Sequence, residues 1–168
     1  VQDARVKKTN WFWDNRKEFL AQLFKEIKSS VKSAAKKQIN HCFRLNLTSD
    51  LPWENMVVKH FPDSQFYDYT KHLKRFVAYL EGKLPSNYHL TYSRDETTPD
   101  TLVKSLCASG GNVAVVFRGS LPKTWLGIEV IDGDDSDLRF QDGNGKIVGL
   151  LEKGLAKKDE TGFVVEPC

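Results

Sequence analysis

Residues 14–38 repeat apolar side chains at steps of three and four, the pattern of a helix with one buried face. These apolar positions are Phe19, Leu20, Leu23, Phe24, Ile27 and Val31. Asn10 or Asp14 is a suitable helix cap, and lysines occupy the polar side. The pattern predicts a basic, amphipathic helix over residues 14–38. The polar and basic residues 1–9 are expected to be loosely held.

After this helix, short apolar runs alternate with helical segments. The runs expected to form strands are 41–47, 65–69, 88–92, 112–117 and 128–131. Between them we predict a short helix opening at 51–54, with Asp50 as its cap, and helices over 74–82 and 101–108. Such alternation is typical of parallel βαβ units with right-handed crossovers. The fold class is therefore predicted as α/β, with residues 41–131 in mostly parallel βαβ units that form an open sheet or a partial TIM-like barrel.

The last part of the chain, residues 132–168, has a different pattern. Residues 138–141 and 146–149 flank the sequence Asp-Gly-Asn-Gly at 142–145, which is a strong β-hairpin signal. A polar loop is expected over 153–162, and a last edge strand over 163–165. We therefore predict an acidic loop, a C-terminal β-hairpin and a tail.

The composition excludes several protein classes. The chain has 168 residues, of which 40% are hydrophobic and 28% charged, which fits one globular domain over residues 1–168. No apolar run approaches the roughly 20 residues of a membrane span, and no secretory signal opens the chain. We therefore expect no membrane partner. The first residue is Val1 and not Met, as in a processed or trimmed piece of something longer.

Cysteine usage favours a reducing compartment. Cys42, Cys107 and Cys168 lie far apart, and one of them would stay unpaired in a monomer. No Cys and His cluster has the spacing of a structural zinc site, so a zinc finger is excluded. We expect a cytoplasmic protein.

Charge is distributed unevenly along the chain, although its net value is only +3. Residues 1–45 contain 11 Lys and Arg against 4 Asp and Glu, whereas the remainder is acidic. A basic helix face of this kind is more often solvated than bound to nucleic acid, and both interpretations stay open.

Polar side chains follow every predicted strand. In a parallel sheet these positions meet at one edge, where ligands bind. Lys71, Arg94 and Arg118 could converge there on an anion, while carboxylates hold a cation. The strand-end positions are Asn46, Thr48 and Asp50; Asp68, Tyr69, Thr70 and Lys71; Ser93, Arg94, Asp95 and Glu96; and Arg118.

The acidic run at residues 131–137 is the densest charged feature. Its carboxylates, Asp132, Asp134, Asp135 and Asp137, are the hard ligands that Mg²⁺, Mn²⁺ and Ca²⁺ prefer. The alternative is a turn in which Asp side chains accept bonds from nearby backbone N–H groups. His89 lies in a predicted strand without a paired nucleophile, so it is assigned no catalytic role.

Several phrases of the sequence resemble, in order and spacing, the gene product 88 proteins of phages and plasmids. The phrases are residues 43–46 with 49–54, 66–71, 87–94, 130–134, 137–140, 148–150 and 157–159. The resemblance covers essentially the whole chain and implies an origin in a mobile element. It also implies successive barrel-like strands, similar to the fold of radical S-adenosylmethionine (radical-SAM) enzymes.

The resemblance implies site residues one phrase at a time. Members of this family usually begin with a cysteine-bearing segment upstream of the stretch that matches Val1. We therefore expect this chain not to hold an iron–sulfur cluster or S-adenosylmethionine. The matched residues are Asp50, Trp53 and Glu54; Tyr69, Thr70 and Lys71; Ser93 and Arg94; and Asp132, Asp134, Asp137 and Arg139.

Together, these features predict a site that binds an anionic ligand, either a nucleotide or nucleic acid, with a divalent Mg²⁺ or Mn²⁺. If the site is catalytic, metal-assisted phosphoester hydrolysis is the expected reaction. One alternative is a non-catalytic phage protein that binds a host factor through its basic helix. Another is a degenerate radical-SAM relative. The predicted ligand-binding residues are Asp50, Glu54, Tyr69, Lys71, Ser93, Arg94, Arg118 and Arg139, and the predicted metal ligands are Asp132, Asp134 and Asp137.

Overall fold

A computed structural model describes residues 2–47 and 49–167. The strand-end candidate Thr48 lies outside the described residues, as do Val1 and Cys168. The helices are α1 (Gln2–Asp14), α2 (Arg16–Lys37), α3 (Trp53–Met56), α4 (Leu73–Leu80) and α5 (Asp100–Ala108), with 3₁₀ turns η1 (Val58–His60), η2 (Arg139–Gln141) and η3 (Gly154–Lys158). The strands are β1 (Cys42–Phe43), β2 (Gln65–Thr70), β3 (Tyr88–Ser93), β4 (Val113–Phe117), β5 (Thr124–Trp125), β6 (Ile128–Asp132), β7 (Ile147–Leu151) and β8 (Val164–Val165).

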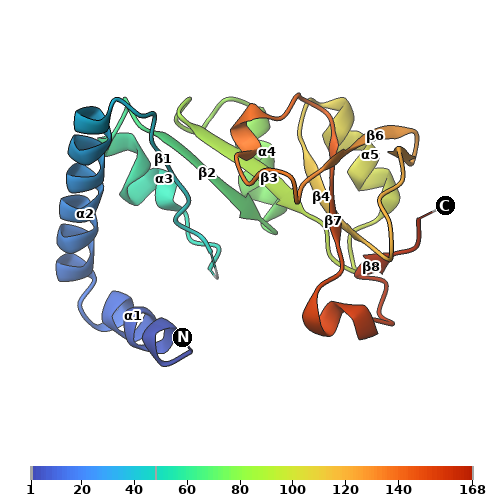
Figure 1. The fold of residues 1–168 in the computed structure, drawn as a ribbon, viewed down its shortest axis with the longest axis horizontal. Coiled ribbons are helices and arrows are strands. Elements are labelled where there is room, and N and C mark those ends of the chain that lie inside the picture. The colour runs from blue at the N-terminus through green and yellow to red at the C-terminus, as the bar shows by residue number, and fades with distance from the viewer. Residues whose placement is uncertain (1, 48, 168) are drawn as a thin grey trace.

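The predicted α/β class with a mostly parallel, open sheet is confirmed. The strand order is β1-β2-β3-β4-β7-β6-β5, and β8 pairs with β4. All pairs are parallel except β5 with β6. The order ends at β1 and β5, so the sheet does not close into a barrel. Figure 1 shows this sheet running across the molecule, from α2 at one side to β8 near the C-terminus.

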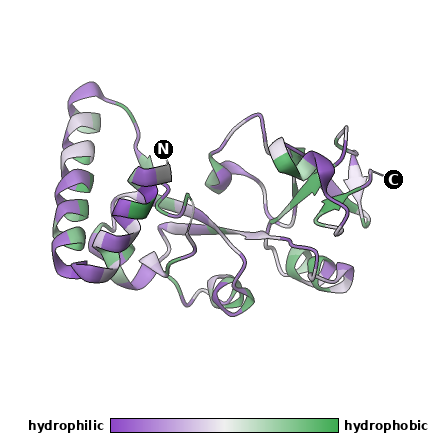
Figure 2. Ribbon diagram, turned by 90° about the horizontal axis from the view of Figure 1, so that it is seen from below, coloured by the Kyte–Doolittle hydropathy of each residue, from purple (hydrophilic) through white to green (hydrophobic). Residues whose placement is uncertain are grey.

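The core lies on the strands and is covered by helices. Phe66, Leu90, Val113 and Ile147 are fully buried within β2, β3, β4 and β7. Phe76 of α4 is also fully buried, against Tyr92 of β3. Figure 2 shows green, hydrophobic residues on the strands and on one side of α2, while much of α2 is purple. This burial fixes the strands whose ends carry the predicted site.

The N-terminal segment differs from the prediction, because it forms a helix of its own. Residues 2–9, expected to be loosely held, belong to α1, which ends at Asp14, and α2 begins at Arg16. Phe12 explains this structure: it is 3% exposed and makes edge-to-face contacts with Phe19 and Trp53. Together with the contact of Trp11 with Phe19, this burial docks α1 against α2 and α3.

The predicted C-terminal hairpin is wrong. Residues 139–141 form η2, and β7 runs parallel to both β4 and β6. The connecting loop is held by Asn112, whose Nδ2 donates to the Gly143 carbonyl at 2.7 Å and whose Oδ1 accepts from the Lys146 N–H at 2.9 Å. The Asn112 side chain thus satisfies two backbone groups of the loop.

The only antiparallel pair in the described part of the sheet joins β5 to β6 through Leu126 and Gly127. Both residues have positive φ angles, 54° and 80°, as a type I′ turn requires. Leucine rarely adopts this conformation, so the sequence gives no signal for the turn.

Smaller differences concern element ends. The strand predicted over 41–47 is reduced to β1. Pro52 and not Asp50 stands at the N-cap of α3, which leaves the Asp50 carboxylate for other partners. Among the described residues, no helix is long and apolar enough to span a membrane.

Candidate functional site

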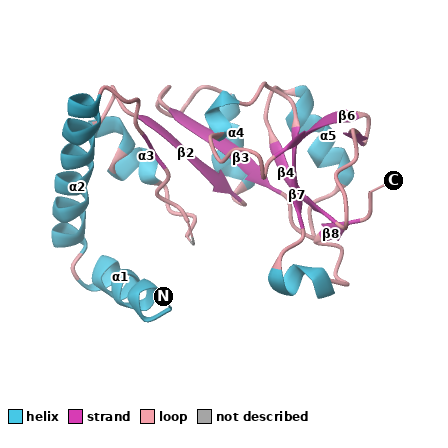
Figure 3. Ribbon diagram, viewed as in Figure 1, coloured by secondary structure: helices cyan, strands magenta, loops and turns pink. Residues whose placement is uncertain are grey.

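A pocket of about 510 Å³ lies at the carboxyl ends of β1, β2 and β3. We call it the strand-end pocket. Four predicted ligand-binding residues line it, namely Asp50, Tyr69, Lys71 and Ser93. Figure 3 shows the strands as magenta arrows, whose heads mark these ends. The remaining lining residues are Arg44, Asn46, Leu47, Ser49, Thr70 and His72.

Three cationic or basic side chains line the strand-end pocket. Lys71 is exposed, its Nζ lies 5.4 Å from the Phe163 ring centre, and it makes no ion pair within residues 2–47 and 49–167. The Arg44 guanidinium lies 4.7 Å from the Tyr69 ring centre. The exposed His72 has its Nε2 3.9 Å from an Asp50 oxygen.

Asp50 does not offer a free negative charge to the pocket. Its Oδ2 accepts hydrogen bonds from the Lys71 N–H at 2.8 Å and from Thr70 Oγ1 at 2.9 Å. Its Oδ1 accepts a bond from Arg75 Nη1 at 2.6 Å. Asp50 therefore fixes the turn that follows β2 and so positions Lys71 at the pocket.

Arg75 and Glu54 form a buried ion pair beneath the pocket. Glu54 is 5% exposed, and its carboxylate accepts bonds from Arg75 Nε at 3.1 Å and Nη2 at 2.8 Å. Arg75 Nη2 also donates to the Tyr88 hydroxyl at 2.6 Å. The predicted ligand residue Glu54 thus lies below the pocket and pairs with Arg75 there.

Asp68 continues this network inward. Its side chain is 1% exposed and accepts bonds from the Asn46 N–H at 2.8 Å and from the Tyr88 hydroxyl at 2.7 Å. Burial raises the pKa of Asp68 to about 6, although the bonds from Tyr88 and Asn46 act in the opposite direction. The burial of Tyr88, followed by the nearby Asp68, likewise raises the pKa of its hydroxyl.

Asn46 joins this network to the loop between β1 and α3, from which Ser49 and Asp50 line the pocket. Its Oδ1 accepts bonds from Ser49 Oγ at 2.8 Å, from the Leu51 N–H at 2.9 Å and from Trp53 Nε1 at 2.8 Å. One buried amide oxygen therefore holds the chain between β1 and α3 in place.

Sequence reasoning missed Arg44, His72, Arg75 and Tyr88. Arg75 was recognisable as a partly buried position, because it lies four residues before Tyr79 and therefore on the same side of α4. An arginine on a buried helix face needs carboxylate partners, and Asp50 and Glu54 are those partners.

Arg94 and Arg118 do not line the strand-end pocket. Arg94 Nη1 donates to the Gly162 carbonyl at 2.9 Å. Arg118 donates to the Lys157 carbonyl at 3.1 Å and to the Asp159 carbonyl at 2.8 Å, and it pairs with Glu166. Both arginines hold the C-terminal segment against the sheet, and of the three predicted cations only Lys71 lines the strand-end pocket, although Lys71 and Arg94 both contact Phe163.

The three predicted metal ligands each have a different partner. Asp132 accepts a bond from the Asp134 N–H at 2.8 Å, which is the turn alternative for the acidic run. Asp134 pairs with Lys153 at 2.6 Å, and Asp137 pairs with Arg44 at 3.0 Å. Across residues 2–47 and 49–167, no group of three or more His, Cys, Asp and Glu side chains is arranged to hold a metal ion.

Arg139 is the first residue of η2 and is buried, and it is not among the residues that line the strand-end pocket. Its side chain is 1% exposed, its Nη2 donates to the Ser136 carbonyl, and its Nη1 lies 3.4 Å from an Asp142 oxygen. Burial, and secondarily the charge of Arg139, lower the pKa of His89 to about 4. Neutral imidazole is therefore the expected form of His89 at pH 7.

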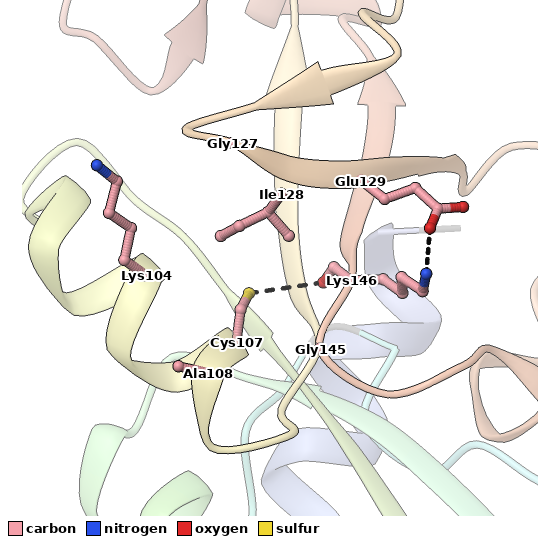
Figure 4. Close-up of a pocket in the computed structure, with 8 residues that line it drawn as sticks. All are labelled: Lys104, Cys107, Ala108, Gly127, Ile128, Glu129, Gly145 and Lys146. Carbon is pink, nitrogen blue, oxygen red and sulfur yellow. Dashed lines mark hydrogen bonds and ion pairs between the residues drawn. The ribbon is translucent and has the colours of Figure 1, made fainter.

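A second pocket, of about 350 Å³, lies between the end of α5 and the amino ends of β6 and β7 (Figure 4). Cys107 lines it, and its Sγ is directed toward the Lys146 carbonyl in the close-up. Burial raises the pKa of the Cys107 thiol to about 11, so the thiol is protonated and weakly nucleophilic at neutral pH. Lys146 pairs with Glu129 in the same pocket. These contacts indicate no reactive group.

The cysteines do not fit an iron–sulfur cluster in the strand-end pocket. Such clusters are held mainly by cysteine thiolates. In the described ranges the free cysteines are Cys42, at the start of β1, and Cys107, near the end of α5. Neither lines the strand-end pocket. The likeness to radical-SAM enzymes therefore gives no reason to place cluster chemistry in the strand-end pocket.

Comparison with known proteins gives one assignment. No curated protein and no solved structure matches this sequence. The model of one family, described as gene product 88, matches residues 1–167. Because this match covers nearly the whole sequence, the chain belongs to the gene product 88 family.

Proposed function

We propose that this protein binds a small ligand carrying a phosphate or pyrophosphate group in the strand-end pocket. The observation that carries the proposal is Lys71, which lines the pocket and forms no direct ion pair in the described ranges, although its charge also acts on Asp95 outside the lining. Open parallel sheets bind ligands outside the carboxyl ends of their strands, where this pocket lies.

The balance of charges favours an anion. The one acidic side chain in the lining, Asp50, is already paired with Arg75 at 2.6 Å. Lys71 and Arg44 are both cationic and both line the pocket. A phosphate oxygen near them gains charge-assisted hydrogen bonds, which are shorter and stronger than neutral ones.

Asp137 does not engage every N–H group of Arg44. Its Nη1 is engaged by Asp137, but its buried Nε–H has no hydrogen-bond partner among the residues described. Asp137 is largely exposed, at 61%, so a ligand anion can compete with it for the guanidinium. We infer that Arg44 exchanges Asp137 for the ligand.

The size and surface of the pocket favour a nucleotide over a free phosphate ion. A volume of about 510 Å³ is within the range of small-molecule sites. Leu47, 72% exposed, and the Tyr69 side chain offer apolar surface for a base or sugar. Ser93 and Ser49 add hydroxyl groups that can bond to sugar oxygens.

We propose ligand binding without a chemical step. The expected divalent ion and metal-assisted hydrolysis rest on the acidic run, whose carboxylates Asp132, Asp134 and Asp137 have the separate partners described above. Both stay predictions from the sequence. The radical-SAM alternative is not proposed, because Cys42 and Cys107 do not line the pocket.

Titration calorimetry with inorganic pyrophosphate and with adenosine diphosphate tests the proposal. We expect saturable binding of the wild-type chain, and a roughly tenfold weaker affinity in Lys71→Met, because one charged hydrogen bond contributes about 1.5–3 kcal/mol. Lys123→Met is the matched control: it removes an exposed lysine beside β5, at the other end of the strand order.

Binding of adenosine diphosphate at least as tight as that of pyrophosphate supports a nucleotide ligand. An equal loss of affinity in Lys71→Met and Lys123→Met contradicts the proposed site. Absence of saturable binding of both probes to the wild type contradicts the proposed function.

A further inference from the structure

Four lysines form a continuous stripe along the outer side of α2. Lys25, Lys28, Lys32 and Lys36 follow one another at steps of three, four and four residues, which places them on one side of a helix. We call them the lysine stripe. All four are exposed, and the ion pairs found across the described ranges include none of them.

Glu26 is the one acidic residue within the stretch from Lys25 to Lys36. Between Glu26 and Asp50 the sequence contains no Asp or Glu. An unbalanced row of exposed lysines concentrates positive potential on one helix face. The row is therefore complementary to a regularly spaced polyanion.

The opposite side of α2 packs against the rest of the protein. Ile27 and Ala34 are buried, and Phe19, Leu20 and Leu23 pack against the hydrophobic core. An amphipathic helix that binds a membrane must present a free apolar face. Since that face is covered here, and α2 lies along one side of the molecule (Figures 1 and 3), the lysine stripe is the surface that α2 presents outward.

A groove of about 300 Å³ runs beside the stripe, between α2 and residues 60–64. Lys28 and Lys32 line it together with the apolar side chains Val31, Phe61 and Pro62. Cations next to an apolar, partly aromatic surface are typical of sites that hold the phosphate backbone and the bases of a single strand. Asp63 also lines the groove and is its one acidic residue.

We propose that the lysine stripe and this groove bind single-stranded nucleic acid. Phosphates contact Lys25, Lys28, Lys32 and Lys36, and an unpaired base enters the groove beside Phe61. A duplex keeps its bases stacked inside, so it gains nothing from the groove. The surface is separate from the strand-end pocket, whose lining contains none of these residues.

Fluorescence anisotropy with a labelled oligothymidine tests this proposal at several salt concentrations. In Lys28→Gln/Lys32→Gln we expect roughly 20-fold weaker binding near 0.1 M salt, and a salt slope smaller by about 1.4, because two phosphate contacts are lost. Lys104→Gln/Lys123→Gln is the control with the same change in charge at two exposed lysines outside α2, and it should bind as the wild type does.

Three outcomes overturn the proposal. The first is no binding of oligothymidine to the wild type even at low salt. The second is an equal loss in the control variant, which would reveal only general charge attraction. The third is tighter binding of a duplex of the same length than of the single strand. The affinity of Lys28→Gln/Lys32→Gln for pyrophosphate should be unchanged. This would show that its loss of oligothymidine binding does not arise at the strand-end pocket.

Discussion

Arg75 is shared by two carboxylates beneath the strand-end pocket, Asp50 at 2.6 Å and Glu54 at 2.8 Å. Replacing it by Leu leaves Glu54 as an uncompensated, buried charge. We expect Arg75→Leu to lower the free energy of unfolding by about 3–5 kcal/mol, which urea titration measures. Arg5→Leu, at an exposed site on α1, is the control. A loss below about 1 kcal/mol in Arg75→Leu would show that the ion pair does not hold the structure together.

The raised pKa of Asp68 predicts that the free energy of unfolding depends on pH. Its pKa is about 6 in the folded state against an ordinary value of 3.8, so the folded state retains a proton between pH 4 and 6 that the unfolded state has lost. Stability contributed by this group is therefore present at low pH and is lost as pH rises through that window. Relative to Asp68→Asn, the wild type should lose on the order of 3 kcal/mol between pH 4 and 7.

Denaturant titrations of both proteins across this pH range measure the difference. His89 shifts in the opposite sense, because its lowered pKa favours unfolding as pH falls from about 6.5 toward 4, but it is common to both proteins and cancels. A constant difference between wild type and Asp68→Asn would contradict the protonated, buried carboxyl.

At the scale of residues, the sequence predicts the rim of the pocket better than its support. Asp50, Tyr69, Lys71 and Ser93 are identified because each follows or ends an apolar run, and parallel strands bring their ends together. The bonds of Arg75 reach across 21 and 25 residues. Such pairing depends on the rotation of α4 about its own axis where it packs on the sheet. The apolar periodicity of a sequence predicts that rotation only to within about one residue.

Among the elements, β7 shows how closely the sheet is packed. A Cβ added at Gly149 would lie 2.7 Å from Val130 Cγ1 and 3.0 Å from Leu121 Cδ2. We expect Gly149→Ala to cost about 1–3 kcal/mol of stability, because neighbouring side chains must move. Gly143→Ala, whose Cβ would meet only Lys146 Cε at 3.4 Å, is the control. Equal melting temperatures for the two variants would show that β7 is loosely packed.

Asp137, two residues before η2, forms an ion pair with Arg44 of the strand-end pocket. In Asp137→Asn the guanidinium loses its charged partner, so we expect pyrophosphate to bind up to about fivefold more tightly, since an exposed ion pair contributes up to about 1 kcal/mol. The same calorimetric titration measures this gain. Weaker binding in Asp137→Asn would mean that Asp137 supports the ligand and does not compete with it.

The C-terminal elements illustrate what local sequence cannot reveal. Residues 142–145 have hairpin composition, yet Asn112, more than 30 residues earlier, binds the backbone of Gly143 and of Lys146. The strand that follows enters the sheet between β4 and β6, where Ile147 and Val148 are fully buried. Long-range burial thus overrides the turn signal, whereas the ends of β2, β3 and β4 follow the prediction to within one residue.

At the scale of the whole molecule, the consecutive order of β1 to β4 follows from repeated βαβ units, whereas the insertion of β7 between β4 and β6 does not.

The divalent ion expected from the acidic run stays a prediction from sequence. Its test is the melting temperature with and without Mn²⁺ in the wild type and in Asp132→Ala. A rise confined to the wild type supports a metal site in the run, and no rise in the wild type contradicts one.

Anion binding at the carboxyl ends of β1, β2 and β3 is the central claim. Backbone amide chemical shifts, recorded by NMR while inorganic pyrophosphate is added to the 19.2 kDa chain, test where it binds. We predict that the largest shifts occur at Asp50, Lys71, His72 and Ser93. No shifts up to about 10 mM pyrophosphate, or largest shifts around Cys107 or along α2, would contradict it.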